Sequence, residues 1–587
     1  MGQFFKYLLA TILGFFIVIF LLVIIGIGTI AGIASSAEKT PDVKVNSVLK
    51  IQLNDFLPEL TNNVPISNFN FQQESVPGLS EIKKALKKAQ TDDKIKGIYL
   101  EQSFTPLGFS TAQDIHKALV EFKESGKFIV SYGDYISQGG YYLSSLGDPL
   151  IVNPSGMVDF RGLSSEIPFF KNILDKSGVK LQIYYAGQFK GATEPYRLTK
   201  LSDQNRMQIS SYLNELYQNF TLDIAKGRKM EHESIKKIAY DYSALIPDDA
   251  LRLGMVDILG YRDQADSIIR EKIGLNESEK INFISLNKYI DAVSEQPDLK
   301  VKDKVAVVYA EGTIIMGKGE NGSIGDEKYV EIFETIEKDD KIKAVVLRVN
   351  SPGGSALSSE NILRSIQKVR EKGKSVIISM GDYAASGGYY ISCQADSIFA
   401  QPNTITGSIG VFSIIPSAQE LLTEKIGITF DTVKTGPYAN GISLAYDITP
   451  AEGAKIQMMT DRTYEAFLER VSKARNMTRD EVHAVAQGRV WTGRQGIEAG
   501  LVDRLGTLED AINAAAGLSK LEKYRISEYP KVKDPVMQLI EDITSGEIST
   551  LLEKKIKTKI PFIDLLESKS FSPENIQALM PYTTNLN

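Results

Sequence analysis

The chain has 587 residues, too many for one hydrophobic core, which predicts two or more domains. With 43% hydrophobic and 24% charged residues, its composition is typical of a globular protein. The formal net charge is -6 and the sequence has no long basic run, so we expect no nucleic-acid partner. The single cysteine, Cys393, excludes an intrachain disulfide framework and a cysteine-based zinc site.

An uncharged, strongly apolar run extends from Tyr7 to Ile33. A bilayer core needs about 20 apolar residues, whereas the apolar part of a signal peptide has about 7–15. We therefore expect a transmembrane helix within an N-terminal anchor over residues 1–40. A cleaved signal peptide, ending near the small residues 34–37, is the weaker alternative. Because Lys6 precedes the run, the positive-inside rule predicts a cytoplasmic N-terminus and an extracytoplasmic body, which in a bacterium would face the periplasm or the cell exterior.

The chain contains an internal repeat. The segment GDYISQGGYY at residues 133–142 returns as GDYAASGGYY at residues 381–390. Two further pairs of similar segments occur in the same order and at nearly the same spacing, namely 92–97 with 339–344 and 254–260 with 500–506. Three matches in register predict two tandem copies of one domain.

Within each copy, short β-branched runs alternate with amphipathic helical stretches. That alternation predicts an α/β fold with a mostly parallel sheet. Beyond the second copy, the mixture of charged and apolar residues suggests helical extensions. We expect an anchor over residues 1–40 and a first α/β repeat, which supplies a lysine, over 46–290. A second α/β repeat, which supplies a serine, is expected over 300–520, and a helical C-terminal extension over 521–587.

Residues that both copies share are expected to serve the common fold. Positions at which the copies differ are therefore better candidates for function. Where the first copy has Gln138, the second has Ser386. Lys190 of the first copy aligns with Ala439 of the second. The second copy alone has the segment NSPGGS at residues 350–355. The second copy thus has the serine and the glycine segment, and the first has the lysine, so neither copy is predicted to be active alone.

Ser386 follows a predicted strand and precedes a predicted helix, a position that suits a nucleophile. Backbone N–H groups at such a turn stabilise a developing oxyanion. The N–H of Gly387 is the natural first donor, and the Gly353-Gly354 turn is expected to bring a second one. A serine at the start of a helix is more often a simple cap. We interpret Ser386 as a nucleophile because each copy lacks a residue that the other copy has.

A serine nucleophile needs a base. The histidines, His116, His232 and His483, lie in charged helical stretches and are expected on solvated helix faces. A lysine can act as the base if burial lowers its pKa from about 10.4. Lys190 follows Phe189 in an aromatic-rich stretch, and Ser408 is positioned to orient its amine. The other candidate bases, Lys425 and Lys434, rank below it.

These motifs together resemble a known family. ASGGY at 385–389, NSPGGS at 350–355, TGSIG at 406–410 and GRVWTG at 488–493 are similar to the long form of the bacterial signal peptide peptidase A family, also called protease IV. The resemblance covers the anchor and both repeats in order.

The resemblance implies two tandem Clp-protease/crotonase-like repeats after an N-terminal transmembrane helix. It implies a serine endopeptidase with a Ser/Lys dyad, Ser386 and Lys190, with Ser408 near the lysine and Gly387 and Gly353 as oxyanion donors. It further implies a homotetramer on the membrane that degrades signal peptides left there after preprotein processing. No cofactor and no metal are implied.

Two alternatives remain open at this point. A crotonase-like fold would also suit an acyl-CoA enzyme that places a thioester in the oxyanion hole. A non-catalytic membrane scaffold would keep the architecture without the chemistry. The anchor and the Ser/Lys pair argue against the first, and retention of both dyad residues argues against the second.

Overall fold

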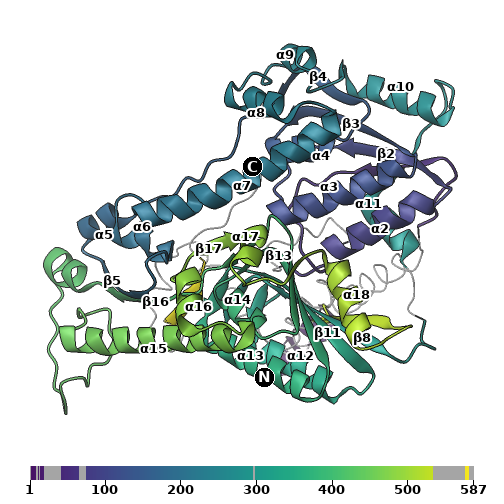
Figure 1. The fold of residues 1–587 in the computed structure, drawn as a ribbon. Helices are drawn as coiled ribbons and strands as arrows, with labels where there is room; N and C mark the ends of the chain where they lie inside the picture. The colour runs from purple at the N-terminus through teal and green to yellow at the C-terminus, as the bar shows by residue number, and fades with distance from the viewer. Residues whose placement is uncertain are drawn as a thin grey trace.

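The structure is a computed structural model that describes residues 41–64, 75–294, 298–532 and 576–580, together with parts of 2–18. Two parallel sheets, one in each half of the chain, form the body of the molecule (Figure 1). The first has the strand order β6-β4-β3-β2-β1-β7. Its strands are β1 (Ser47–Ile51), β2 (Ile95–Glu101), β3 (Phe128–Ile136), β4 (Leu150–Val158), β6 (Ile258–Leu259) and β7 (Asn282–Ser285).

The second sheet repeats this order, which confirms the internal repeat. Its strands pair as β18-β14-β13-β11-β8-β19, each parallel to its neighbour. They are β8 (Lys304–Glu311), β11 (Ile342–Ser351), β13 (Ser375–Ala385), β14 (Ser397–Ala400), β18 (Arg504–Leu505) and β19 (Arg525–Tyr529). The long β13 also pairs with β15 (Ile405–Gly407), which continues antiparallel to β17 (Val490–Thr492).

Helices cover both faces of each sheet, because alternate residues of every buried strand point to opposite faces. In β2, Ile98 and Leu100 face one core and Tyr99 faces another. The helices of the first repeat are α2 (Leu79–Thr91), α3 (Phe109–Glu124), α4 (Gln138–Ser144), α5 (Lys171–Ser177), α6 (Glu194–Arg197), α7 (Asp203–Arg228), α8 (His232–Tyr240), α9 (Pro247–Arg252), α10 (Arg262–Ile273) and α11 (Leu286–Val293). Those of the second are α12 (Asp326–Lys338), α13 (Ala356–Glu371), α14 (Gly387–Ser392), α15 (Pro450–Arg475), α16 (Arg479–Val485), α17 (Gly493–Glu498) and α18 (Leu508–Leu518).

A third sheet joins the two repeats. Its order is β10-β9-β12-β20-β16-β5, from β10 (Ser323–Gly325), β9 (Thr313–Ile315), β12 (Gly353–Ser355), β20 (Ile576–Leu579), β16 (Val411–Ser417) and β5 (Lys180–Ala186). Strand β5 belongs to the first repeat but pairs along its whole length with β16 of the second. In Figure 1 this arm, with α5 and α6, reaches from the first repeat to lie beside β16 and α15.

Buried polar contacts also hold the repeats together. Asp382 in β13 accepts hydrogen bonds from the N–H groups of Ser110 and Thr111, at 2.8 and 3.0 Å, at the start of α3. Arg348 in β11 makes a two-pronged ion pair with Glu59, at 2.9 and 3.0 Å. The Arg348 and Glu59 side chains are only 1% and 3% exposed, so each charge depends on the other.

The structure corrects the expected helical extension over 521–587. The parts of it that are described contain strands: β19 completes the second parallel sheet beside β8, and β20 lies in the third sheet. By analogy with β7, β19 belongs to the second repeat, whose structure therefore continues to Tyr529.

The expected anchor over 1–40 falls mostly outside the described residues. Among those that are described, no helix is long and apolar enough to cross a bilayer.

Candidate active site

Ser386 stands at the sharp turn between β13 and α14. Its backbone has a φ of 56° and a ψ of -114°, a conformation that is costly for a residue with a side chain. The turn is held by the Ser386 N–H, which donates to the Gly407 carbonyl at 2.7 Å. In the first repeat Gln138 takes the place of Ser386. It is the first residue of α4 and its φ is not positive, and Ser137 before it caps the helix in the ordinary way. The strained backbone is therefore present at Ser386 and absent from Gln138.

Lys190 follows strand β5 and is carried by it into the second repeat. The Phe189 N–H donates to the Gln487 carbonyl at 2.8 Å, which ties the lysine loop to the loop before β17. Gly488, with a φ of 81°, leaves the room that this approach needs, because a Cβ there would lie 2.6 Å from Lys190 N. Gln208 of α7 donates to the Phe189 carbonyl at 3.0 Å and completes the support.

The two side chains meet. Lys190 Nζ and Ser386 Oγ are 2.7 Å apart and hydrogen-bonded. Lys190 Nζ also bonds the Ser408 carbonyl at 3.0 Å and the Ser408 hydroxyl at 3.1 Å. Ser386 and Ser408 are fully buried, and Lys190 is 1% exposed. The structure thus brings together the serine, the lysine and the second serine that the sequence singled out.

Burial lowers the pKa of the Lys190 ammonium well below its usual 10.5, because the apolar surroundings disfavour the charged form. No carboxylate contributes to that shift. A neutral amine has two N–H groups and one lone pair. The two Ser408 oxygens accept the N–H groups, which leaves the lone pair for the Ser386 hydroxyl proton. The geometry is that of a general base beside its nucleophile.

The glycine loop lies against the nucleophile turn. Gly353 and Gly354 have φ values of 101° and 155°, and a Cβ on Gly353 would lie 2.7 Å from Gly387 N. The Gly353 N–H itself donates to Ser351 Oγ at 3.1 Å. The next residue, Gly354, has its N atom 3.1 Å from the Cβ position of Gly387. The N–H of Gly354 therefore joins that of Gly387 as a candidate oxyanion donor.

The other candidate bases are elsewhere. Lys425 and Lys434 are exposed, the first bonded to the Lys176 carbonyl and the second over the ring of Tyr446. Contrary to expectation, His116 is not on a solvated face. It is 7% exposed, and its ring stacks on Tyr142 with centroids 4.6 Å apart, because α3 is covered on this side by α4 and α7.

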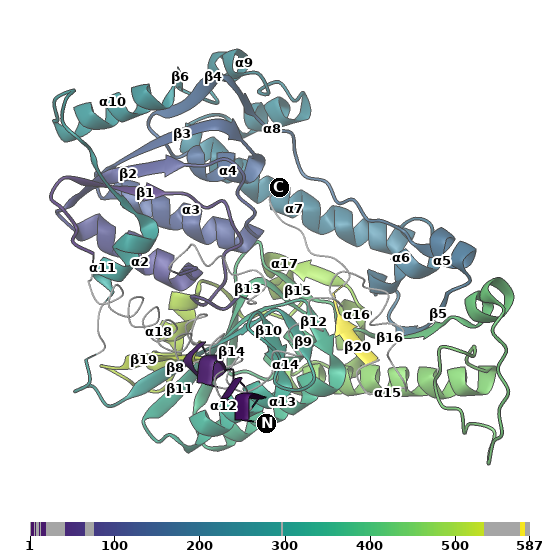
Figure 2. The ribbon, with the colours of Figure 1, turned by 180° about the vertical axis from the view of Figure 1, so that it is seen from behind.

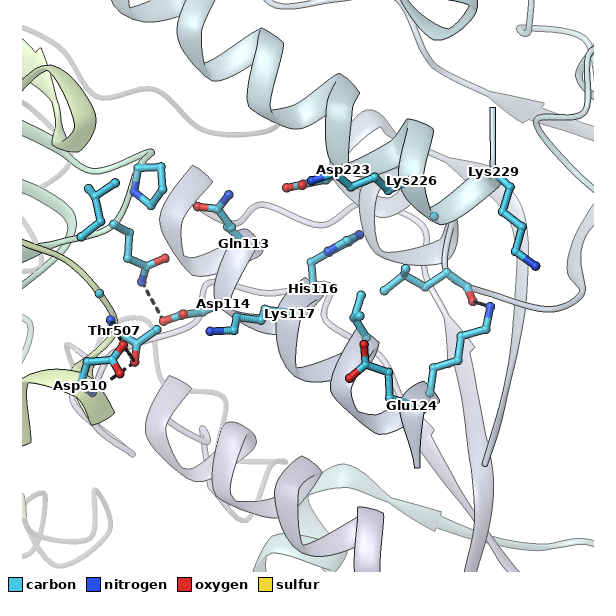
Figure 3. Close-up of a pocket in the computed structure, with 18 residues that line it drawn as sticks. Gln113, Asp114, His116, Lys117, Glu124, Asp223, Lys226, Lys229, Thr507 and Asp510 are labelled. Atoms are coloured by element: carbon cyan, nitrogen blue, oxygen red, sulfur yellow. Dashed lines mark hydrogen bonds between the residues drawn. The ribbon is translucent and has the colours of Figure 1, made fainter. Parts of the chain in front are cut away.

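A second cavity, of about 720 Å³, lies where α3 and α7 meet residues 505–507 of the second repeat (Figure 3). Asp114, Lys117 and Lys226 are among its lining residues, and Figure 3 shows His116 beside them. Burial lowers the pKa of His116 to about 4, so its ring is neutral. The residues that line the cavity include none of Ser386, Lys190 and Ser408. Its Thr507 hydroxyl donates to Asp510 at 2.9 Å as part of the N-terminal cap of α18. The cavity is a weaker candidate for the chemistry.

Two supporting residues escaped sequence reasoning. Gly488 and Gln208 position Lys190. Gly488 stands in a motif that the sequence marked, but its role depends on a contact with the other repeat. No local pattern around Gln208 distinguishes it from an ordinary helix residue.

Comparisons with known proteins agree with this site. The family described as peptidase family S49 matches residues 121–276 and 368–522, once in each repeat. The family described as Clp protease matches residues 296–406, which contain the glycine loop and Ser386. The two repeats are thus of the Clp-protease-like kind.

Similar proteins span most of the chain. Protease 4 from Haemophilus influenzae is 35% identical over 477 residues, which are 80% of this chain and 76% of that protein. Protease 4 from Salmonella typhi is 32% identical over 94% of this chain and 90% of its own length. A chloroplastic serine protease SPPA from Arabidopsis thaliana is 30% identical over 81% of this chain and 70% of its own.

Proposed function

Because the chain belongs to peptidase family S49 and is a serine peptidase, we propose that Ser386 is its nucleophile and Lys190 its general base. The observation that carries the proposal is the 2.7 Å contact between Lys190 Nζ and Ser386 Oγ, in a buried pocket that lowers the pKa of the amine. Ser408 holds the amine with both of its oxygens.

The reaction follows from these positions. Ser386 Oγ attacks the carbonyl carbon of the scissile peptide bond while its proton passes to Lys190 Nζ. The N–H of Gly387 and the Gly353-Gly354 turn stabilise the oxyanion that forms, which in this class of reaction is a large part of the rate enhancement. Lys190 then gives the proton to the leaving amine. A water molecule, deprotonated by Lys190, hydrolyses the acyl-enzyme.

We further propose that the substrates are signal peptides left in the membrane after preprotein processing. The third sheet supports this, since β12 and β16 flank a slot beside the site that holds one antiparallel strand, β20, and an extended peptide in that slot would bind by strand addition. A relative from Enterococcus faecium has the name putative signal peptide peptidase SppA and is 34% identical over 305 residues. Residues 1–40 would anchor the enzyme in the bacterial inner membrane, with its body on the periplasmic side, as a homotetramer.

One experiment tests the dyad. The detergent-solubilised chain is incubated with a fluorophosphonate probe, which labels activated serines. We expect labelling of the wild type and none of Ser386→Ala or Lys190→Ala. Lys200→Ala, at an exposed lysine of the same repeat, is the matched control and should label normally. A folded wild type without labelling would refute the proposal.

The substrate proposal has its own test. Hydrolysis of a synthetic signal peptide is compared with that of a charged peptide of equal length. Preference for the apolar peptide supports the assignment, and equal rates contradict it. An acyl-CoA thioester serves as a third substrate. Its turnover in place of peptide would favour the alternative enzyme class that the crotonase-like fold suggests.

A further inference from the structure

The second cavity lies between the two repeats and is separate from the dyad. Helices α3 and α7 of the first repeat form one side of it, and residues 401–402, 505–507 and 510 of the second form the other (Figure 3). Its volume of about 720 Å³ is in the range, about 300–1,000 Å³, that is usual for small-molecule sites. Such sites are common where two domains meet. Size and place therefore suit a small ligand.

Two buried polar atoms in the wall lack a hydrogen-bond partner within the described residues. They are Nε2 of His116 and Oε1 of Gln113. The His116 side chain is 7% exposed, and its ring is held by stacking on Tyr142. Figure 3 shows both side chains on α3 among the residues that line the cavity. A buried polar atom without a partner is destabilising, so a ligand that supplies the missing hydrogen bonds gains affinity from both.

The lysines of the lining carry free positive charge. Lys117, Lys226 and Lys229 are exposed at its rim, and none of the three forms an ion pair within the part of the chain that the structure describes. Lysine ammonium groups at such a rim attract and bind carboxylates.

Most carboxylates of the lining are already engaged by neighbouring side chains. They accept hydrogen bonds at 2.7 to 2.9 Å, Asp114 from Gln401, Asp223 from Tyr142 and Asp510 from Thr507. Only the exposed Glu124 has no such bond among the described residues. Free positive charge thus exceeds free negative charge, and an anionic ligand is favoured.

The lining also has an apolar part, made by Val120, Leu146, Pro402 and Leu505. A ligand that fits therefore carries an anionic group for the lysines, an apolar body, and an N–H donor for Gln113 Oε1. A short apolar peptide with a free C-terminal carboxylate has all three. A fatty acid lacks the N–H, and inorganic phosphate lacks the apolar body.

We propose that this cavity binds short apolar peptides, with Lys117, Lys226 and Lys229 around the C-terminal carboxylate and Gln113 Oε1 accepting a peptide N–H. Peptides of this kind are what a peptidase releases from an apolar substrate. The identification of the ligand as the enzyme's own product rests on the function proposed above. The lysines and the unpartnered atoms are independent of it.

A ligand in this place contacts both repeats, and the dyad exists only while the repeats are docked. In Figure 2, α7 runs from beside α4 to the arm with α5 and α6. Along it, Gln208 supports the lysine loop, and Asn219 donates to Asn403 of the second repeat at 2.7 Å. A peptide held between α7 and Pro402 therefore stabilises the docked arrangement without occupying the dyad.

The test measures binding to the full-length Ser386→Ala chain, which keeps the probe intact under the proposed mechanism. The probe is a leucine tripeptide with a fluorophore at its amino end, followed by fluorescence anisotropy. We expect saturable binding, and binding at least about 10-fold weaker when the C-terminus is amidated, because charge-assisted hydrogen bonds are lost. Lys226→Gln should weaken binding several-fold, and Lys200→Gln, at an exposed lysine of the same repeat, should not. Equal affinity for the acid and the amide would overturn the proposal.

A second variant distinguishes a ligand contact from a structural one. Gln113→Leu removes the unpartnered acceptor, so the denaturant midpoint of the free protein should stay or rise while affinity for the tripeptide falls several-fold. A lower midpoint with unchanged affinity would show that Gln113 is only structural and would contradict the proposal. Added tripeptide should raise the midpoint of Ser386→Ala and leave that of its Lys226→Gln variant almost unchanged.

Binding in the groove is the main competing explanation. Gly353→Ala, in the glycine loop beside Ser386, should leave tripeptide affinity unchanged in the Ser386→Ala background. A loss there would place the peptide in the groove and refute the cavity site. Palmitate or inorganic phosphate that displaces the probe better than unlabelled tripeptide would refute the peptide as the ligand.

The two proposals fail in different ways. A wild type that labels with fluorophosphonate and hydrolyses peptides, yet shows no carboxylate-dependent binding in the Ser386→Ala chain, refutes the cavity site alone. A wild type that does not label, with tripeptide binding that still depends on Lys226, refutes the proposed function and keeps the site.

Discussion

Lys190 Nζ lies 2.7 Å from Ser386 Oγ, although 196 positions separate the two residues in the chain. The contact exists because β5 of the first repeat pairs with β16 of the second and delivers the lysine to a turn that its own repeat lacks. The carbonyl and hydroxyl oxygens of Ser408 accept hydrogen bonds from the same amine. The proposed base thus comes from one copy and the proposed nucleophile from the other.

The pH dependence of hydrolysis should report the base. Burial lowers the pKa of Lys190 well below 10.5, and the proposed mechanism requires the neutral amine. We expect kcat/KM to rise with pH on the acid side and to reach its plateau well before an exposed lysine would lose its proton. Measurement from about pH 5 to about pH 10 checks this. A rise centred on the usual lysine value would show that Lys190 is charged in the free enzyme.

Ser408→Ala should slow the reaction without removing it. The hydroxyl fixes the amine, and its loss leaves the Ser408 carbonyl as the remaining acceptor. We expect kcat to fall about 10- to 100-fold, equivalent to about 1.4–2.8 kcal/mol, with KM little changed. The acid limb of the pH profile should also move. Ser365→Ala removes a buried hydroxyl that bonds a helix carbonyl away from the site, and should have no such effect.

Lys190→Met should stabilise the protein while abolishing hydrolysis. The folded-state pKa of Lys190 is lowered, so between that value and about 10.4 the unfolded chain binds a proton that the folded chain does not. The stability of the wild type therefore rises with pH across that window. The advantage of Lys190→Met should be largest near neutral pH and shrink towards pH 10.

Denaturant midpoints at two pH values measure the difference. Lys200→Met, at an exposed lysine, should show no pH-dependent gain. Equal midpoints for Lys190→Met and wild type at neutral pH would contradict the idea that burying this amine costs stability.

Gly353→Ala should obstruct the proposed oxyanion site. Its Cβ would lie 2.0 Å from the carbonyl oxygen of Ala578 and 2.7 Å from Gly387 N, which is a proposed oxyanion donor. We expect peptide hydrolysis to fall by more than about 100-fold, since an obstruction at the oxyanion site removes transition-state stabilisation. Gly373→Ala is the matched control: Gly373 also has a positive φ, 78°, but open space around it. Similar activity losses in the two variants would mean that backbone strain, and not obstruction, is responsible.

The buried Arg348–Glu59 pair should be important for stability. Replacing Arg348 by alanine leaves a buried carboxylate without its partner, which typically costs about 3–5 kcal/mol. The double variant Arg348→Met, Glu59→Leu should recover much of that loss. Arg364→Ala breaks an exposed pair with Glu371 and should cost less than about 1 kcal/mol. Denaturant midpoints compare them, and a double variant no better than Arg348→Ala would contradict the charge-based explanation.

Much of the site could be predicted because its signals are local or repeated. Ser386 and Gly387 are marked by a strand, a turn and a helix in series, and Lys190 by its absence from the other copy. A mostly parallel α/β sheet was implied by the alternating elements, and the structure has one in each half. The expectation for His116 was wrong, because the helix that carries it is covered by α7, far away in the sequence.

The sequence by itself determined the duplicated α/β architecture and the complementary chemistry of the copies, because periodicity and the comparison of two aligned segments need no knowledge of distant contacts. The tertiary structure alone decided how the copies meet. The pairing of β5 with β16, the room that Gly488 leaves for Lys190 and the seat of β20 beside Gly354 all join segments far apart in the chain. Short strands have no periodic signature, and their partners are selected by open sheet edges and buried side chains that exist only after the chain has folded.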